Sequence, residues 1–199
     1  MTGINRWKEL PVVSGALVAI NVVVYIAGLF PGSVLYARGN LNVVDVLINR
    51  EYGRILWSVF LHADIQHLLN NMLILYFLGS MIEKEVGHLC YAFLFFLSGI
   101  GGNLMSLTVK VMGNELSHSI GASGAVFGLD GVLLAMVLFA GRHMPRVTPG
   151  RVVAMIVLSL YSGFSGYNID NAAHVGGLIT GFLSGCAVCI LQRRRRGGQ

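Results

Sequence analysis

The sequence predicts an all-α membrane protein built as a bundle of six transmembrane helices. Hydrophobic residues make up 55% of the 199 residues and charged residues only 12%, and the mean hydropathy is +0.70. These values are far from those of soluble globular domains. Six spans of roughly 20 residues each would use about 120 positions and leave only short connections. We therefore expect a single membrane domain over residues 1–199.

The hydrophobic pattern places the six helices in order along the chain. The expected ranges are about 12–30, 67–82, 89–111, 123–141, 151–164 and 172–191. The first range is longer than the apolar core of a signal peptide, so we expect it to be retained as a span. The fifth range is short for a bilayer, because Pro149-Gly150 bounds it on one side and the Gly- and Ser-rich residues 162–166 bound it on the other. A tilted or mobile element is compatible with that length.

The basic residues predict the orientation of the bundle. An even number of spans puts both termini on one side, and ten of the fourteen Lys and Arg residues would lie there. They are Arg6, Lys8, Lys84, Arg142, Arg146, Arg151 and Arg193 to Arg196. Because positive charge concentrates in cytoplasmic connections, we expect a short cytoplasmic N-terminus over residues 1–11 and a basic cytoplasmic tail over residues 192–199.

Composition and charge also bear on partners and location. The net charge is +5, but the basic residues are scattered around spans and form no face for nucleic acid. Cys186 and Cys189 lie one helical turn apart in an apolar run without further metal ligands, so we expect them to be packing residues. We expect no organelle transit peptide, which favours a bacterial plasma membrane.

In this topology the second, fourth and sixth helices run from the outer side inward, so their N-terminal ends share one depth. His67 and Asn71 begin the second helix, Ser123 begins the fourth and His174 begins the sixth. Glycines at intervals of three or four residues line one face of the fourth helix and one face of the sixth. They are Gly121, Gly124, Gly128 and Gly131, and then Gly177, Gly181 and Gly185. Because such spacing lets membrane helices approach closely, we expect these two helices to pack face to face.

The residues at this depth have the chemistry of a nucleophile, a base and an oxyanion site. A neutral imidazole within about 3 Å can take the proton of a serine hydroxyl, so His174 would activate Ser123. The N–H of Ser123 at a helix start, with His67 and Asn71 at i and i+4, can donate to a developing oxyanion. The alternatives are that His174 is an interfacial residue and that His67 and Asn71 only cap the second helix or bond a neighbouring helix.

Several segments in sequence order carry a recognisable pattern. They are Arg54, the run from His62 to Asn71, Glu83 with Gly87, Gly121-Ala122-Ser123-Gly124, and Ala173-His174-Val175-Gly176-Gly177 followed by Gly181. Together these motifs resemble the rhomboid family of six-helix intramembrane serine proteases. The similarity extends from about Tyr52 to Gly185, which is most of the chain. Two positions depart from the family pattern: Gly53 stands in place of a tryptophan, and Phe127 stands where tyrosine is common.

The resemblance implies a serine endopeptidase with a rhomboid-like bundle. It implies a catalytic dyad of Ser123 and His174 without an acidic third member, and an oxyanion hole made by His67, Asn71 and the Ser123 amide. Supporting roles fall to Phe127, which can stack against the histidine, and to Gly121, Gly124, Gly177, Gly181, Arg54 and His62. No metal and no organic cofactor are implied.

The resemblance also implies how substrates are handled. The loop from about residue 31 to 66 would lie partly in the outer interface, and the fifth helix with the 162–171 loop would gate substrate access. The expected partners are membrane lipid and single-span membrane proteins, which would be cleaved in or near their spans.

Two other functions compete with the protease. A catalytically inactive rhomboid-like scaffold that binds membrane clients would be free to lose the serine or the histidine, and this chain keeps both. A small transporter would carry polar residues along a path through the membrane, whereas here they cluster in the outer half. Asp130, two turns beyond Ser123, is the exception. It is either a protonated or hydrogen-bonded structural group or a deep polar contact that tunes the fourth helix.

Overall fold

The computed structural model describes residues 10–139, 147–165 and 169–197, and the regular elements in these residues are helices. The long ones are α1 (Val12–Gly28), α4 (Ile65–Val86), α5 (His88–Met112), α6 (Ser123–Phe139), α7 (Pro149–Ser165) and α8 (Asn171–Gly197). The six helical segments expected from the sequence are therefore confirmed, with ends that differ by a few residues. Residues 1–9, residues 140–146 with Arg142 and Arg146, and residues 166–168 of the expected gating loop lie outside the described residues.

Length and composition identify a membrane-embedded protein. Among the described helices, α4, α5 and the Asn171–Arg194 part of α8 are long and apolar enough to cross a membrane. α1, α6 and the Pro149–Tyr161 part of α7 are shorter apolar helices. Large apolar side chains face outward on the bundle, among them Phe77, Leu89 and Leu183. An apolar exterior of this kind suits hydrocarbon and not water.

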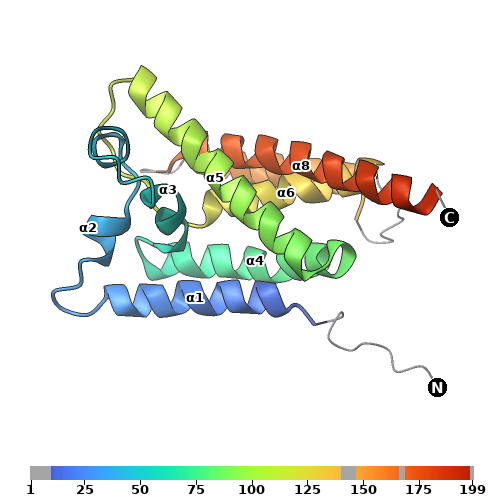
Figure 1. Cartoon of the computed structure of the whole chain (residues 1–199), viewed down its shortest axis with the longest axis horizontal. Coiled ribbons are helices and arrows are strands. Elements are labelled where there is room, and N and C mark those ends of the chain that lie inside the picture. The colour runs from blue at the N-terminus through green and yellow to red at the C-terminus, as the bar shows by residue number, and fades with distance from the viewer. Residues whose placement is uncertain (1–9, 140–146, 166–168, 198–199) are drawn as a thin grey trace.

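The centre of the bundle is formed by α5, α6 and α8, which pack on one another. In Figure 1, α1 and α4 lie side by side along one edge, α5 crosses the bundle obliquely, and α8 runs along the opposite edge. α6 is the most enclosed helix, with 12 of its 17 residues buried, because it contacts α4, α5, α7 and α8. A helix that is apolar all round is expected in such a central position.

The seam between α6 and α8 is made of backbone. A Cβ atom added at Gly177 would lie 1.9 Å from the carbonyl oxygen of Gly124, and one added at Gly181 would lie 1.9 Å from that of Gly128. Real Cβ atoms do not approach so closely, so the two helices touch along glycine. The face-to-face packing expected from the glycine spacing is confirmed.

Glu83 ties the C-terminal end of α4 to the start of α1. Its carboxylate accepts hydrogen bonds of 2.8 Å from the N–H groups of Val13 and Ser14, which begin α1. Those N–H groups have no partner within their own helix. Glu83 therefore has a structural role, because it satisfies two N–H groups at the start of α1.

Between α1 and α4 the chain forms short helical pieces that the hydrophobic pattern does not reveal. They are α2 (Leu35–Gly39), the π-helical turn η2 (Val44–Ile48), α3 (Arg54–Trp57) and the 3₁₀ turn η3 (Ser58–Phe60). Three to five residues are too few for a period to be recognised in a sequence, so only a loop was expected here.

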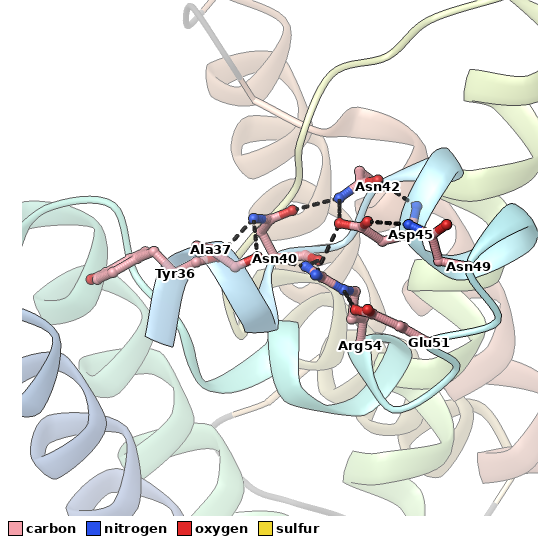
Figure 2. Close-up of polar contacts among 8 residues, drawn as sticks. All are labelled: Tyr36, Ala37, Asn40, Asn42, Asp45, Asn49, Glu51 and Arg54. Atoms are coloured by element: carbon pink, nitrogen blue, oxygen red, sulfur yellow. Dashed lines mark hydrogen bonds and ion pairs between the residues drawn. The ribbon is translucent and has the colours of Figure 1, made fainter. Parts of the chain in front are cut away.

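Arg54 holds this segment together (Figure 2). Its guanidinium lies 2.9 Å from the carboxylate of Asp45 and 2.6 Å from that of Glu51. It also donates to the carbonyl oxygens of Ala37 at 2.9 Å and Asn40 at 3.0 Å. Because the Arg54 side chain is only 7% exposed, these bonds replace the water that it loses on burial.

Asp45 is the second centre of the same network (Figure 2). Asn42 donates to its carboxylate at 2.6 Å and Asn49 does so at 2.9 Å. The hydrogen bond from Asn42 is the main reason that the pKa of Asp45 lies below its ordinary value, with smaller contributions from Asn49 and the charge of Arg54. The segment is thus anchored by an arginine and its carboxylates, whereas the resemblance implies a tryptophan at the position of Gly53.

Candidate active site

Ser123 and His174 meet at the N-terminal ends of α6 and α8. Nε2 of His174 lies 2.9 Å from Oγ of Ser123, which is a hydrogen-bond distance. The ring of Phe127, one turn after Ser123, stacks on the imidazole with centroids 4.3 Å apart and planes 17° apart. Nδ1 of His174 is buried and has no hydrogen-bond partner among the described residues. The plane of the imidazole is therefore held by an aromatic stack and not by a carboxylate.

The segment that leads into α6 is attached to the rest of the fold by its backbone. Leu41 and Ser119 exchange two N–H to carbonyl hydrogen bonds of 2.9 Å, and the N–H of Gly121 donates to the carbonyl of Ser58 at 2.9 Å. Gly121 has a φ of +130°, and a Cβ there would lie 2.7 Å from Cε1 of His67. Glycine is therefore required at this position both by conformation and by space.

His67 and Asn71 face the same cavity as Ser123, from α4. Asp64 caps this helix, because its carboxylate accepts a hydrogen bond of 2.8 Å from the N–H of His67. Nδ2 of Asn71 donates to the carbonyl of His67 at 2.9 Å. That bond uses one of two amide hydrogens, so Asn71 can bond within α4 and still donate to an oxygen in the cavity.

His62 and Arg54 are placed behind the site and not in the lining of the cavity. His62 is fully buried, and its ring meets that of His67 edge to face with centroids 5.1 Å apart. Burial, followed by the neighbouring His67, lowers the pKa of His62 to about 4, so this imidazole is neutral at neutral pH. Its carbonyl accepts a hydrogen bond from the hydroxyl of Tyr36. His62 is thus part of the wall that supports His67.

Asp170 was not singled out from the sequence, yet it starts the helix that carries His174. Its Oδ1 accepts a hydrogen bond of 2.9 Å from the N–H of Ala173, and its carbonyl accepts one of 3.2 Å from the N–H of His174. An aspartate side chain that accepts a hydrogen bond from the N–H three residues later is the usual N-cap arrangement. That spacing could have been recognised from the sequence.

The other carboxylate oxygen of Asp170 joins α8 to α5 and to the segment before α6. It accepts hydrogen bonds from the hydroxyls of Ser106 and Ser119, and Nζ of Lys110 lies 3.5 Å away. Burial alone would raise the pKa of Asp170, but the two hydroxyls, the N–H of Ala173 and the ammonium of Lys110 together hold it below the ordinary value. Asp170 is therefore an anion that links the two sides of the site.

Ser123 and His174 lie in a cavity of about 1740 Å³. Residues of α4, such as Asn71 and Ile74, and residues of α7, such as Leu158 and Ser159, line it together with α6. Within the described ranges, no three His, Cys, Asp or Glu side chains are grouped so that they could hold a metal ion.

Asp130 lines the same cavity from α6. It is 4% exposed, and its Oδ1 finds no hydrogen-bond partner in the part of the chain that the structure describes. The hypothesis that Asp130 is a hydrogen-bonded structural group therefore has no support at Oδ1.

Comparison with known proteins identifies the family. Residues 49–191 match the family described as the rhomboid domain. The chain belongs to the rhomboid family. This rhomboid is 36% identical to RHOMBOID-like protein 1 of Arabidopsis thaliana over 156 residues, which are 76% of this chain and 38% of that protein.

Two bacterial relatives carry protease names. Over 144 residues the identity to Rhomboid protease GluP of Bacillus subtilis (strain 168) is 34%, covering 72% of this chain and 27% of that protein. Over 148 residues the identity to Putative rhomboid protease YdcA of the same organism is 31%, covering 74% of this chain and 72% of that protein. This rhomboid spans less than half the length of the Arabidopsis relative and of GluP.

Proposed function

We propose that this rhomboid is an intramembrane serine endopeptidase that hydrolyses peptide bonds in or near the transmembrane segments of single-span membrane proteins. The observation that carries the proposal is the 2.9 Å contact between Nε2 of His174 and Oγ of Ser123, in a cavity also lined by His67 and Asn71. Membership of the rhomboid family and the protease names of two bacterial relatives support the same class of activity.

The proposed dyad works through a single imidazole. Nε2 of His174 accepts the proton of the Ser123 hydroxyl while Oγ attacks the carbonyl carbon of the scissile peptide bond. The protonated imidazole then donates to the departing amine nitrogen, and a water molecule activated by His174 hydrolyses the acyl-enzyme. The first step needs the tautomer with its hydrogen on Nδ1. Because that atom has no described partner, the stack with Phe127 is the restraint that keeps Nε2 directed at Ser123.

The proposed oxyanion hole consists of the N–H of Ser123, the side-chain amide of Asn71 and the ring of His67. The N–H of Ser123 is at the start of α6 and so has no acceptor within its own helix, and the helix dipole favours negative charge there. One amide hydrogen of Asn71 bonds to the carbonyl of His67. The second amide hydrogen remains available to donate to the oxyanion. Each donor of this kind typically contributes about 3 kcal/mol to stabilisation of the transition state.

We also propose that all six long helices span the membrane as a single domain with both termini in the cytoplasm. α6 and α7 have 17 residues each, or about 25 Å of helix, which is at the lower limit for a span. Among the residues that the structure describes, Lys84, Arg151 and Arg193 lie near ends of long helices. The proposed topology puts these ends on the cytoplasmic side, and their positive charge supports that topology. α7 forms one side of the cavity, which supports a gating role for it.

The experiment that tests the activity uses a fluorophosphonate probe and a single-span test substrate with the purified protein. Wild type should be labelled and should cleave the substrate. Ser123→Ala should lose both properties, and His174→Ala should lose cleavage. Ser159→Ala is a matched control, because this serine lines the same cavity without a bond to His174. Labelling that persists in Ser123→Ala contradicts the proposal, and substrate capture without labelling of wild type indicates an inactive scaffold instead.

A further inference from the structure

The C-terminal end of α8 carries a run of positive charge that the proposed reaction does not use. Four arginines, Arg193 to Arg196, directly precede Gly197, where α8 ends. Arg193 and Arg194 are exposed, and neither forms an ion pair with a carboxylate of the described residues. In Figure 1 this end of α8 projects beyond α1, α4 and α5. The run is therefore open to an anionic partner from outside the chain.

The length of α8 places the arginine run in a lipid headgroup layer. α8 is one unbroken helix, and its Asn171–Arg194 part is long and apolar enough to cross a membrane. From Asn171 to Arg193 the helix rises about 33 Å, whereas the hydrocarbon core of a bilayer is about 30 Å thick. Arg193 to Arg196 add about 5 Å, which is close to the depth of one headgroup layer. When α8 crosses the core, its arginines therefore lie among headgroups.

The position of His174 agrees with this placement. His174 precedes Arg193 by 19 residues, which is about 28 Å along the helix. With Arg193 at one boundary of a core about 30 Å thick, His174 lies just inside the other boundary. Water can reach a cavity at that depth, as the proposed hydrolysis requires. The two ends of α8 thus fit one and the same position of the helix in the bilayer.

The orientation of the bundle does not account for the arginine run. Without it the proposed topology still has six basic residues on the cytoplasmic side and four on the outer side, and this bias favours the same orientation. The six are Arg6, Lys8, Lys84, Arg142, Arg146 and Arg151. The same topology puts only three of the nine Asp and Glu residues on the cytoplasmic side. One of the three, Glu83, is bonded to the start of α1, so the chain supplies few anions for the run.

We propose that Arg193 to Arg196 form a binding site for the anionic headgroups of phospholipids in the leaflet where α8 ends. A guanidinium matches the geometry of a phosphate group and can donate two parallel hydrogen bonds to it. Successive positions of an α-helix are about 100° apart, so four positions in a row surround the helix and headgroups can approach from every side. The inference uses the span of α8 and does not depend on the proposed peptidase activity.

The test uses photoactivatable lipids in proteoliposomes. Purified protein is reconstituted in phosphatidylcholine that contains a small fraction of a phosphatidylglycerol probe or of the matching phosphatidylcholine probe, each with its reactive group near the headgroup. Crosslinks to the C-terminal end of α8 are measured by mass spectrometry of its peptides. Wild type should crosslink the anionic probe at least about fivefold more than the zwitterionic probe, the factor expected for one arginine near the surface. High salt should reduce this ratio. Both leaflets contain the probe, so the ratio does not depend on the orientation of the protein in the vesicle.

Variants identify the arginines as the cause of the preference. Replacement of all four by glutamine, from Arg193→Gln to Arg196→Gln, should bring the ratio close to one. Replacement of all four by lysine keeps the charge and should keep most of the preference. Arg38→Gln with Arg50→Gln is the control and should leave the ratio unchanged, because these exposed arginines lie between α1 and α4, on the other side in the proposed topology.

Two results would overturn the headgroup site. The first is an equal yield of the two probes in wild type, a comparison that needs no variant to fold. The second is an unchanged ratio in the glutamine variant, which would show that the preference arises elsewhere. Fluorophosphonate labelling of the same samples reports on the proposed peptidase separately, so either proposal can fail while the other stands.

Discussion

Replacing Gly177 by alanine should separate the two residues of the proposed dyad. The added Cβ would lie 1.9 Å from the carbonyl oxygen of Gly124, which directly follows Ser123. Ordinary contact begins at 3.4 Å, so α6 and α8 must move apart by about 1.5 Å at this level. The hydrogen bond between Ser123 and His174 is 2.9 Å long, and a displacement of that size takes it beyond bonding distance. A misplacement of about 1 Å can cost roughly 100-fold in rate, and overpacking destabilises by about 1–3 kcal/mol.

The assay is the rate of fluorophosphonate labelling, read beside thermal unfolding of the same purified protein. Gly177→Ala should label about 100-fold more slowly than wild type. Gly15→Ala is the matched control, because a Cβ at this position in α1 meets nothing within 4 Å, and it should label at the wild-type rate. A Cβ at Gly185 would lie 3.0 Å from its nearest atoms, so Gly185→Ala should give an intermediate effect. This variant replaces Gly177→Ala in the test if Gly177→Ala does not fold. Wild-type labelling and stability in Gly177→Ala would refute the claim that backbone contact sets the dyad distance.

Three further predictions concern the surroundings of the site. Arg54→Ala should lower the free energy of unfolding by about 3 kcal/mol, because its partner carboxylates lose their shared cation. Arg38→Ala, at an exposed arginine, should change it by less than about 0.5 kcal/mol. Thermal unfolding measures both variants, and equal effects would contradict the network. Asp170→Ala should slow fluorophosphonate labelling about tenfold because α8 loses its cap, and Asp170→Asn should restore part of the rate. Glu115→Ala, at an exposed cavity residue, should label at the wild-type rate. No rescue by asparagine would argue against a positioning role of Asp170. The pKa of His62 is lowered from 6.5 to about 4, so below pH 6.5 the unfolded state binds a proton that the folded state does not. The contribution of His62 to the free energy of unfolding is therefore fully present above pH 6.5 and is lost as pH falls toward 4. Between pH 7 and pH 5 this costs about 2 kcal/mol, and the loss should be smaller in His62→Asn when unfolding is followed across that range.

The long helices and their closest contact could be predicted because both follow from local rules. Apolar runs of the right length identify spans, and glycine or proline marks where they end. The seam of α6 and α8 was predictable because glycine spacing reports which face a neighbouring backbone can approach. Ser123 and His174 lie at corresponding ends of that seam, so their meeting followed from the order of the helices and not from any property of the two residues alone.

The polar connections could not be predicted because they join segments that are distant in the chain. Arg54 was expected to matter only from the resemblance to the family, and its carbonyl partners Ala37 and Asn40 carry no signal in their side chains. No local pattern marks Lys110, which is only 6% exposed and lies beside Asp170. Sequence spacing predicts neighbours within a helix, whereas these partners are brought together only by the folded bundle.

Backbone geometry, more than side-chain pairing, sets the distance between Ser123 and His174. α6 is held against α8 by glycine contacts along the seam, and its start is attached through the backbone of Ser119 and Gly121 to the short elements before α4. The start of α8 is held separately, by the cap and hydroxyl bonds of Asp170. A histidine that lacks a carboxylate partner can rotate unless its helix and its ring are both restrained. The seam and the cap restrain the helix, and Phe127 restrains the ring, so each of the three should be separable by mutation and each should affect Ser123 reactivity more than it affects folding.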